Sequence, residues 1–258
     1  MAQTKIKKNT VDLFYELTRT DFVMRYQNSV LGFAWVLLRP FLLFLILVFV
    51  FSWFFNSHDP NYRYNLLLGV IIFSYFSEAT NRGIVSLKEK SAIILKVNFP
   101  KTLAIYTSVV NSFISFFFSF LVFLLFWLLT KPVTTSINLP YFLIQIFSLS
   151  CLIAGLNFFI GIIYINLRDL SSIWELLLRL LFYGTPIIYP LSSIPAQYKK
   201  IFLLNPLAVI ISESRKALIN GEMFSWGQTI YALLLALMIL LFGFHFFRKN
   251  IKFIAEKL

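Results

Sequence analysis

The chain has 258 residues, of which 59% are hydrophobic and only 13% charged, with a formal net charge of +12. A soluble domain carries about twice this share of charged residues, so the composition excludes an ordinary soluble enzyme. Nucleic acid is not expected as a partner, because the basic residues lie in loops beside apolar segments and form no stripe. The single cysteine, Cys151, and two isolated histidines argue against a disulfide framework or a metal site.

The first element in chain order is an amphipathic segment over residues 9–26. Leu13, Phe14 and Leu17 share one helical face, charged residues occupy another, and Asn9 can cap the helix. This pattern predicts a helix that lies along a membrane interface.

Six apolar segments follow, and each is long enough to cross a bilayer, which needs about 20 helical residues. They cover residues 31–56, 64–84, 102–130, 139–166, 172–190 and 226–247. In the first, Trp35 and Trp53 share a face and are separated by about 27 Å of helix, as interfacial anchors at two membrane surfaces would be. Ser172 and Glu175 have the form of a capping box at the start of the fifth. We expect an all-α integral membrane protein in which residues 1–258 form one transmembrane domain.

The distribution of Lys and Arg orients these spans. The segment before the first span and the loop 82–101 carry five such residues each, whereas the loops after the first and third spans carry one each. Basic loops remain in the cytoplasm and attract anionic membrane lipid, so both termini are expected to be cytoplasmic.

The segment after the fifth span is too long and too apolar for a simple turn. Pro195 can start one short helix, and Asn205 can cap a second helix that has Pro206 at its first position. An ordinary surface loop is the alternative, but it would expose the apolar residues 201–204. We therefore expect a helical hairpin over residues 191–225, resting in or dipping into the outer leaflet.

Charged residues within the spans are few. The glycine pair Gly155 and Gly161 has no following Lys, so no phosphate-binding loop is present and the chain is not expected to hydrolyse ATP. The ionisable residues lie near span ends: Arg39, Glu78, Glu175 and Arg179. Arg39 can reach the membrane surface or contact a substrate phosphate, and Glu78 can pair with Arg82 one turn later.

An aromatic stripe runs along the first span. Its members fall on one face at steps of three and four: Phe33, Leu37, Phe41, Phe44, Val48, Phe51 and Phe55. Helix packing or lipid contact is one explanation. The other is an aromatic lining for a passage, since aromatic faces suit the C–H faces of sugar rings and allow weak, mobile contact.

The residues just before and within the first span resemble those of a known family. The resemblance is carried by Arg25-Tyr26, Ser29, Leu31-Gly32, Trp35 and Pro40, then by Phe99-Pro100, Arg168-Asp169, Pro186-Ile187-Ile188-Tyr189-Pro190, and Asn205-Pro206-Leu207 followed by Arg215. In this order and spacing they resemble the membrane subunits of ABC exporters for polysaccharides. The chain is similar to the O-antigen exporter permease (Wzm) and its capsule and teichoic acid relatives.

The resemblance implies a homodimer in the cell inner membrane that works with two separate ATPase subunits. ATP and Mg would bind to those subunits, and no cofactor is expected in this chain. The implied cargo is a glycan carried on undecaprenyl pyrophosphate. The loops 82–101 and 166–172 would couple to the ATPase, and the 191–225 hairpin would form an outer gate.

Specific residues are assigned to these roles. The channel-lining candidates are Phe33, Phe41, Phe44, Phe51, Phe55 and Tyr183. The candidates for the pyrophosphate or lipid head group are Arg25 and Arg39. The ATPase-coupling candidates are Lys88, Glu89, Lys90, Arg168 and Asp169. The outer-gate candidates are Tyr189, Pro190, Asn205 and Pro206.

Other functions remain as alternatives. A stand-alone carrier or flippase would ordinarily need an ion site in the middle of the membrane, and a membrane-embedded transferase would need clustered acidic or His residues. The sequence has neither pattern. An exporter of another lipid or small molecule from the same superfamily is the nearest alternative.

Overall fold

The structure is a computed structural model that describes residues 2–26, 32–55, 60–91, 100–130 and 137–254. Within these ranges, some residues are described by their backbone alone, without side chains: residues 2–9, 26, 53–55 and 252–254. Trp53, one of the two expected interfacial anchors, and Phe55 of the aromatic stripe belong to that group. Their predicted roles are therefore not tested.

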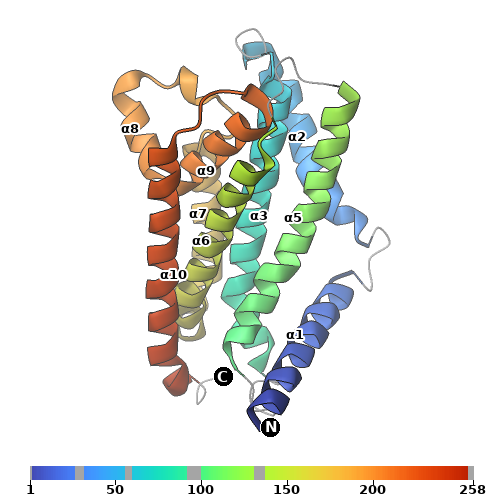
Figure 1. The fold of residues 1–258 in the computed structure, drawn as a ribbon, viewed down its shortest axis with the longest axis vertical. Helices are drawn as coiled ribbons and strands as arrows, with labels where there is room; N and C mark the ends of the chain where they lie inside the picture. Colours follow the sequence, from blue (N-terminus) through green and yellow to red (C-terminus); the bar gives the residue numbers. More distant parts are fainter. Residues whose placement is uncertain (1, 27–31, 56–59, 92–99, 131–136, 255–258) are drawn as a thin grey trace.

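The described segments are helices joined by short connections, as the sequence predicted (Figure 1). In chain order they are α1 (Ala2–Tyr26), α2 (Ala34–Phe55), α3 (Tyr62–Glu89), α5 (Thr102–Thr130), α6 (Leu139–Asn166), α7 (Leu170–Gly184), η1 (Leu191–Ser193), α8 (Ala196–Leu204), α9 (Pro206–Arg215), η2 (Lys216–Asn220) and α10 (Trp226–Ile254). The beginning of α1 and the end of α10 lie at one end of the bundle, which we call the terminal end. Helices α8 and α9 lie toward the other end, which we call the opposite end.

Four of the helices are long and apolar enough to cross a bilayer. These are α2, α5, α6 and α10, with qualifying segments at Ala34–Ser52, Thr102–Thr130, Leu139–Asn166 and Trp226–Ile251. Helices α3 and α7, expected as the second and fifth spans, do not qualify within the described residues. The chain is therefore a multi-pass membrane protein, and the full set of six spans stays a prediction.

Helix α7 differs most from its expected bounds. It has 15 residues, about 22 Å of helix, which is less than the roughly 30 Å of a bilayer core. It ends at Gly184, so the expected span over 172–190 is too long, because prolines at 186 and 190 disfavour a continuing helix. It also begins at Leu170 with Asp169 at the N-cap, which makes the predicted capping box at Ser172 wrong.

Three helices extend further than predicted at the terminal end, and one of them is α10, which continues to Ile254 past the predicted end at residue 247. Helix α1 begins at Ala2, so Asn9 lies inside the helix and does not cap it. Helix α3 continues to Glu89, so the first part of the expected loop over 82–101 is helical. Good helix formers extend α1 and α3. They are Ala, Gln and Lys before residue 9 in α1, and Leu, Lys and Glu near residue 88 in α3.

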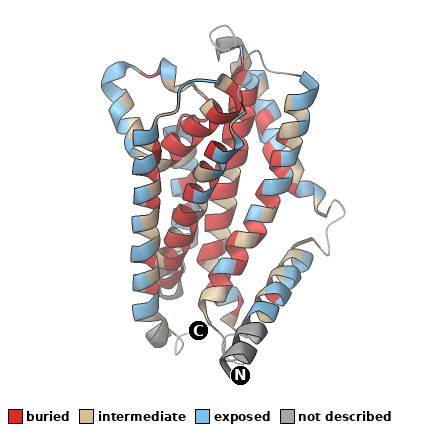
Figure 2. Ribbon diagram, in the orientation of Figure 1, coloured by how far each residue is buried: buried red, intermediate tan, exposed pale blue. Residues whose placement is uncertain are grey.

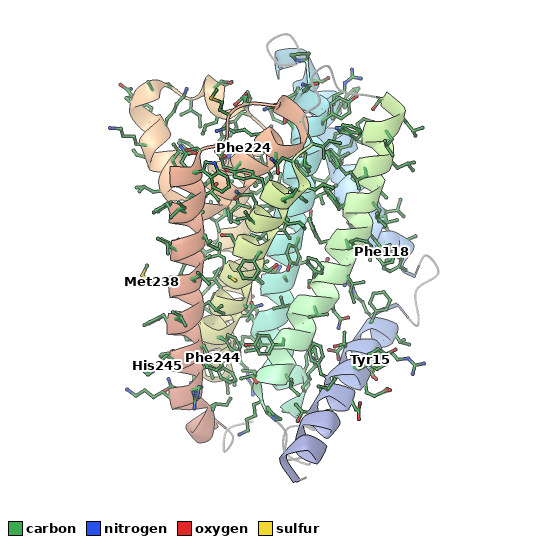
Figure 3. The ribbon with its side chains drawn as sticks, in the orientation of Figure 1. Tyr15, Phe118, Phe224, Met238, Phe244 and His245 are labelled. Carbon is green, nitrogen blue, oxygen red and sulfur yellow. The ribbon has the colours of Figure 1, made fainter. Side chains whose placement is uncertain are left out.

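The buried core follows α3, α6 and α9, whereas α10 and α8 present exposed residues outward (Figure 2). Helices α6 and α10 approach closely at two glycines. A Cβ atom added to Gly243 would lie 2.2 Å from the Gly155 carbonyl oxygen, and one added to Gly155 would lie 2.6 Å from the Ile239 backbone. Small residues at such crossings are typical of helices packed in membranes. On the outer face of α10, Met238 and His245 point away from the bundle (Figure 3).

The two short helices expected after α7 are present, but they occupy different environments. Asn205 caps α9 by accepting a hydrogen bond from the Leu207 backbone N–H at 3.0 Å, and Pro206 is its first residue, as predicted. Residues 207–211 are all buried, because α9 packs against α3, α6 and α10. Helix α8, in contrast, exposes Tyr198 and Ile201. The second helix is therefore an interior element, and the position of the pair relative to a leaflet stays a prediction.

Candidate functional site

The first candidate site is a cavity of about 760 Å³ between α2, α3, α5 and α7, closed on one side by the last turn of α1. Three arginines and one carboxylate reach it from three helices. They are Arg25 of α1, Arg39 of α2, and Arg82 and Glu78 of α3. We call this site the arginine cavity. The sequence predicted Arg25 and Arg39 as separate candidates for one anionic head group, and the structure brings both to one cavity.

Arg25 connects α1 to two other helices. Its guanidinium forms an ion pair with the Glu78 carboxylate and donates a hydrogen bond to Ser115 Oγ at 2.9 Å. The Nε of Arg82 lies 3.3 Å from the same Glu78 oxygen, so the ion pair predicted between these two residues is confirmed. The sequence did not predict that Arg25 shares Glu78, because residues 25 and 78 are distant in the chain and belong to different helices.

Arg39 stands apart from this cluster. It is exposed, and among the described residues no carboxylate forms an ion pair with it. Pro40 follows directly inside α2 and has no backbone N–H, so the carbonyl of Val36 loses its usual helical partner. Arg39 and Pro40 both line the cavity. The α2 wall therefore presents a guanidinium that pairs with no carboxylate in the described part of the chain.

The remaining wall combines polar and aromatic side chains. The polar ones are Ser74, Ser77, Asn81, Ser115 and Ser119, and the aromatic ones are Trp35, Phe73, Tyr75, Phe116 and Phe182. The three guanidinium groups outnumber the single carboxylate, so the site carries a net positive charge. Arginine forms bidentate hydrogen bonds with phosphate, and rings suit apolar or sugar surfaces. Within the described residues no cluster of His, Cys, Asp or Glu could hold a metal ion.

The predicted channel-lining residues do not share one surface. Phe44 is buried against Phe126 of α5, with ring centroids 6.1 Å apart. Phe33 packs edge-to-face on Phe118, at 4.8 Å, and Phe118 projects from α5 toward the start of α2 (Figure 3). Phe51 is half-buried against the core. These contacts are helix packing, the first of the two explanations of the stripe.

The other lining candidates are exposed. Phe41 is 36% exposed and Tyr183 is 67% exposed, one on α2 and one near the end of α7. Neither lines the arginine cavity. Their role in a passage between two subunits stays a prediction.

The ATPase-coupling candidates gather at the terminal end but divide into two groups. Lys88, Glu89, Arg168 and Asp169 are exposed. Lys88 Nζ lies 5.8 Å from the ring centroid of Tyr164, so the end of α3 lies beside the end of α6. The described parts of the two predicted coupling segments are therefore neighbours, and residues 92–99 of the first lie outside the described residues.

Lys90 belongs to the interior instead. Its ammonium group lies 2.5 Å from Asp21 of α1 and also donates hydrogen bonds to Thr107 Oγ1 and the Ala104 carbonyl of α5. It therefore joins α1, the end of α3 and α5. A docking contact would need an exposed group, so Lys88 and Glu89 are the better candidates for that role.

The gate candidates are tied to the irregular segment after α7. The Tyr189 hydroxyl donates to the Tyr183 carbonyl at 2.9 Å, and burial raises the pKa of Tyr189. Asn205 donates from its amide to Thr185 Oγ1 at 3.0 Å. Pro190 is the N-cap of η1, and Pro206 begins α9. All four candidates therefore lie on or beside one connection between α7 and α9.

A buried charged cluster on α9 was not predicted from the sequence. Arg215 donates hydrogen bonds to the carbonyls of Asn65, Pro186 and Ile187 at 2.9, 2.7 and 2.7 Å. Glu213 is fully buried and accepts from the Tyr141 hydroxyl at 2.7 Å, from Lys216 Nζ at 2.8 Å and from the Ser225 backbone N–H at 3.0 Å. The available signal was a pair of charged residues two positions apart in an otherwise apolar helix.

This cluster supports a second cavity, of about 530 Å³, at the opposite end. Its wall includes Lys199, Arg215, Lys216 and Glu222, together with the irregular segment after α7. Nearby, Phe224 stacks on Tyr141 with ring centroids 4.1 Å apart (Figure 3). Arg215 and Glu213 use their polar atoms to hold protein groups, so the cluster serves mainly to fix α9.

Comparison with known proteins gives a consistent result. The model of the family described as "ABC-2 type transporter" matches residues 12–219. The chain is 28% identical over 219 residues to the O-antigen export system permease protein RfbA of Klebsiella pneumoniae, covering 82% of each protein. It is 26% identical over 202 residues to the protein of that name in Myxococcus xanthus, covering 78% of this chain and 77% of that protein. It is also 26% identical over 253 residues to the polysialic acid transport protein KpsM of Escherichia coli, covering 95% of each.

Proposed function

Because the chain belongs to the ABC-2 type transporter family, we propose that it is the membrane-spanning permease subunit of an ATP-driven exporter of lipid-linked polysaccharide. The proposed cargo is an O-antigen-like glycan on undecaprenyl pyrophosphate, which crosses the inner membrane. The names of the similar proteins, an O-antigen export permease and a polysialic acid transport protein, support the polysaccharide class. No covalent chemistry is assigned to this subunit.

The arginine cavity is the observation that carries the lipid-linked part of the proposal. An undecaprenyl pyrophosphate has a negatively charged head group between a long apolar chain and the first sugar. The cavity offers Arg39, which pairs with no carboxylate among the residues that the structure describes, and it offers Arg25 and Arg82 elsewhere on a wall of serines and aromatic rings. Paired phosphates suit several guanidinium groups, and the rings suit the flanking sugar or isoprene units.

The proposed assembly has two copies of this chain and two ATPase subunits that bind ATP and Mg. The exposed residues at the terminal end, Lys88, Glu89, Arg168 and Asp169, form a compact polar surface suited to docking. The terminal end is then cytoplasmic, with both chain termini on that side. Aromatic residues such as Phe41 and Tyr183, exposed on α2 and α7, are suited to line a passage between the two copies.

The test is reconstitution with the ATPase that co-purifies with the chain. In liposomes, we expect undecaprenyl-pyrophosphate-linked glycan to stimulate ATP hydrolysis and to appear on the far side of the membrane. The same glycan without its lipid should do neither. Transport by the purified chain without an ATPase would instead indicate a stand-alone flippase. Stimulation by unrelated lipids or drugs alone would indicate another exporter of the same superfamily.

A further inference from the structure

The arginine cavity already contains an anion of its own. The Glu78 carboxylate forms an ion pair with both Arg25 and Arg82. A phosphate group entering the cavity would meet the same two guanidinium groups. We propose that Glu78 is a resident counter-anion that a lipid pyrophosphate displaces, and that this displacement breaks the contact of α1 with the middle of α3. The inference rests on the proposed function, because it takes the cargo head group as the competing anion.

The Glu78 contacts are suited to exchange. The side chains of Glu78 and Arg82 are 29% and 39% exposed, and ion pairs at this exposure contribute only about 0–1 kcal/mol. Phosphate offers more acceptor oxygens than a carboxylate and can bind a guanidinium in a bidentate manner. A pyrophosphate can therefore compete with Glu78 for Arg82, which is partly exposed, and for Arg25, whose side chain is 12% exposed, through its larger number of acceptor oxygens.

Arg25 is the residue through which displacement would act on α1. Helix α1 packs along α5, and the ion pair from Arg25 to Glu78 is its charged contact with the middle of α3. Asp21 lies one turn earlier on α1, on the same face as Arg25, and holds Lys90. These two ion pairs attach α1 to the cavity and to the end of α3.

The second of these contacts is near the proposed docking surface. Lys90 directly follows α3, whose last turn carries the exposed Lys88 and Glu89. Loss of the Arg25–Glu78 ion pair would leave α1 attached through Asp21, Lys90 and its packing on α5. Binding of the pyrophosphate in the cavity therefore changes how firmly α1 is held against α3. Because Lys90 joins α1 to the end of α3, this change also reaches the surface expected to face the ATPase. The arrangement makes Glu78 a sensor of cargo loading.

The experiment uses the full-length chain in nanodiscs and three lipids that differ in head group. Undecaprenyl pyrophosphate, undecaprenyl monophosphate and undecaprenol are titrated, binding is measured, and amide hydrogen exchange of residues 2–26 is followed by mass spectrometry. We expect the pyrophosphate to bind most tightly and to increase exchange in α1, with undecaprenol doing neither. Exchange in α6, which is buried on most sides, serves as the internal reference.

Two variants sharpen the test. Glu78→Gln removes the resident charge, so α1 should exchange rapidly without lipid, and the pyrophosphate should bind roughly tenfold more tightly. Glu175→Gln makes the same chemical change at an exposed site on α7 that does not line the cavity, and it should match the unmodified chain. If Glu78→Gln does not yield folded protein, the unmodified chain alone tests the proposal. Binding of the three lipids and hydrogen exchange of α1 then show whether the pyrophosphate displaces Glu78.

The possible failures are distinguishable. If the pyrophosphate lipid binds but α1 exchange stays unchanged, or if Glu78→Gln binds it no more tightly than the Glu175→Gln control, the sensor is overturned and the proposed cargo stands. If no polyprenyl phosphate binds at any concentration tested, the proposed cargo and the sensor are both overturned.

Discussion

Two charged clusters of the bundle, one around Glu78 and one around Glu213, hold a carboxylate in opposite ways. Glu213 is fully buried and has three polar partners on α6, η2 and the segment before α10. Glu78 is partly exposed and shares one oxygen between two arginines at the edge of a cavity. A buried charge that loses a partner is costly, whereas a partly exposed one can turn to water or to a ligand. The Glu213 cluster is therefore suited to fix the fold, and the Glu78 cluster is suited to exchange partners.

The largest effect is expected from breaking the fixed cluster at Arg215. Arg215→Ala would leave three buried carbonyls on α3 and the post-α7 segment without their donor, at a cost of at least about 3 kcal/mol. We expect a large loss of folded protein, measured as the yield of monodisperse material and its thermal transition in detergent. Arg179→Ala, at an exposed position on α7, is the control. Equal stability of the two variants would contradict the assignment of Arg215 as a structural residue.

The close approach of α6 and α10 at Gly155 and Gly243 allows a second test of a fixed part of the fold, at a contact that involves no charged residue. Gly243→Ala places a Cβ against the Gly155 backbone, which cannot turn aside as a side chain could, so the helices must separate. We expect a loss of about 1–3 kcal/mol, measured by thermal or denaturant unfolding. Gly227→Ala on the same helix meets nothing within 4 Å and is the matched control. A destabilisation common to both variants would show that the crossing is not the cause.

In the arginine cavity, removal of a charge is expected to affect function and leave folding intact. Arg39→Ala should weaken the stimulation of ATP hydrolysis by lipid-linked glycan about tenfold, because Arg39 pairs with no carboxylate among the described residues and its charge is available to the head group. Its thermal transition should stay within about 0.5 kcal/mol of the unmodified chain. Reconstituted complexes provide the measurement, with Arg179→Ala again as the control. An unchanged lipid response would remove Arg39 from the binding site.

The sequence predicted the parts of this molecule that depend on local pattern. The long apolar helices, the α9 cap at Asn205 and the ion pair from Glu78 to Arg82 all follow from residues close in the chain. The partners of Arg25 and Lys90 did not, because they come from distant helices and no local spacing encodes them. The burial of α9 was also missed, because no local pattern shows that packing against three helices covers nearly all of it.

The smallest expected effect is also the most direct comparison of the two carboxylates. A double-mutant cycle on Arg82 and Glu78 should give a coupling energy below about 1 kcal/mol, because both side chains are partly exposed. The corresponding cycle on Lys216 and Glu213 should give a larger value, since Glu213 is fully buried and Lys216 is its nearest cation. Unfolding free energies of the single and double variants supply both numbers. Equal coupling in the two cycles would mean that burial does not separate the clusters, and the division between a fixed and an exchangeable carboxylate would fail.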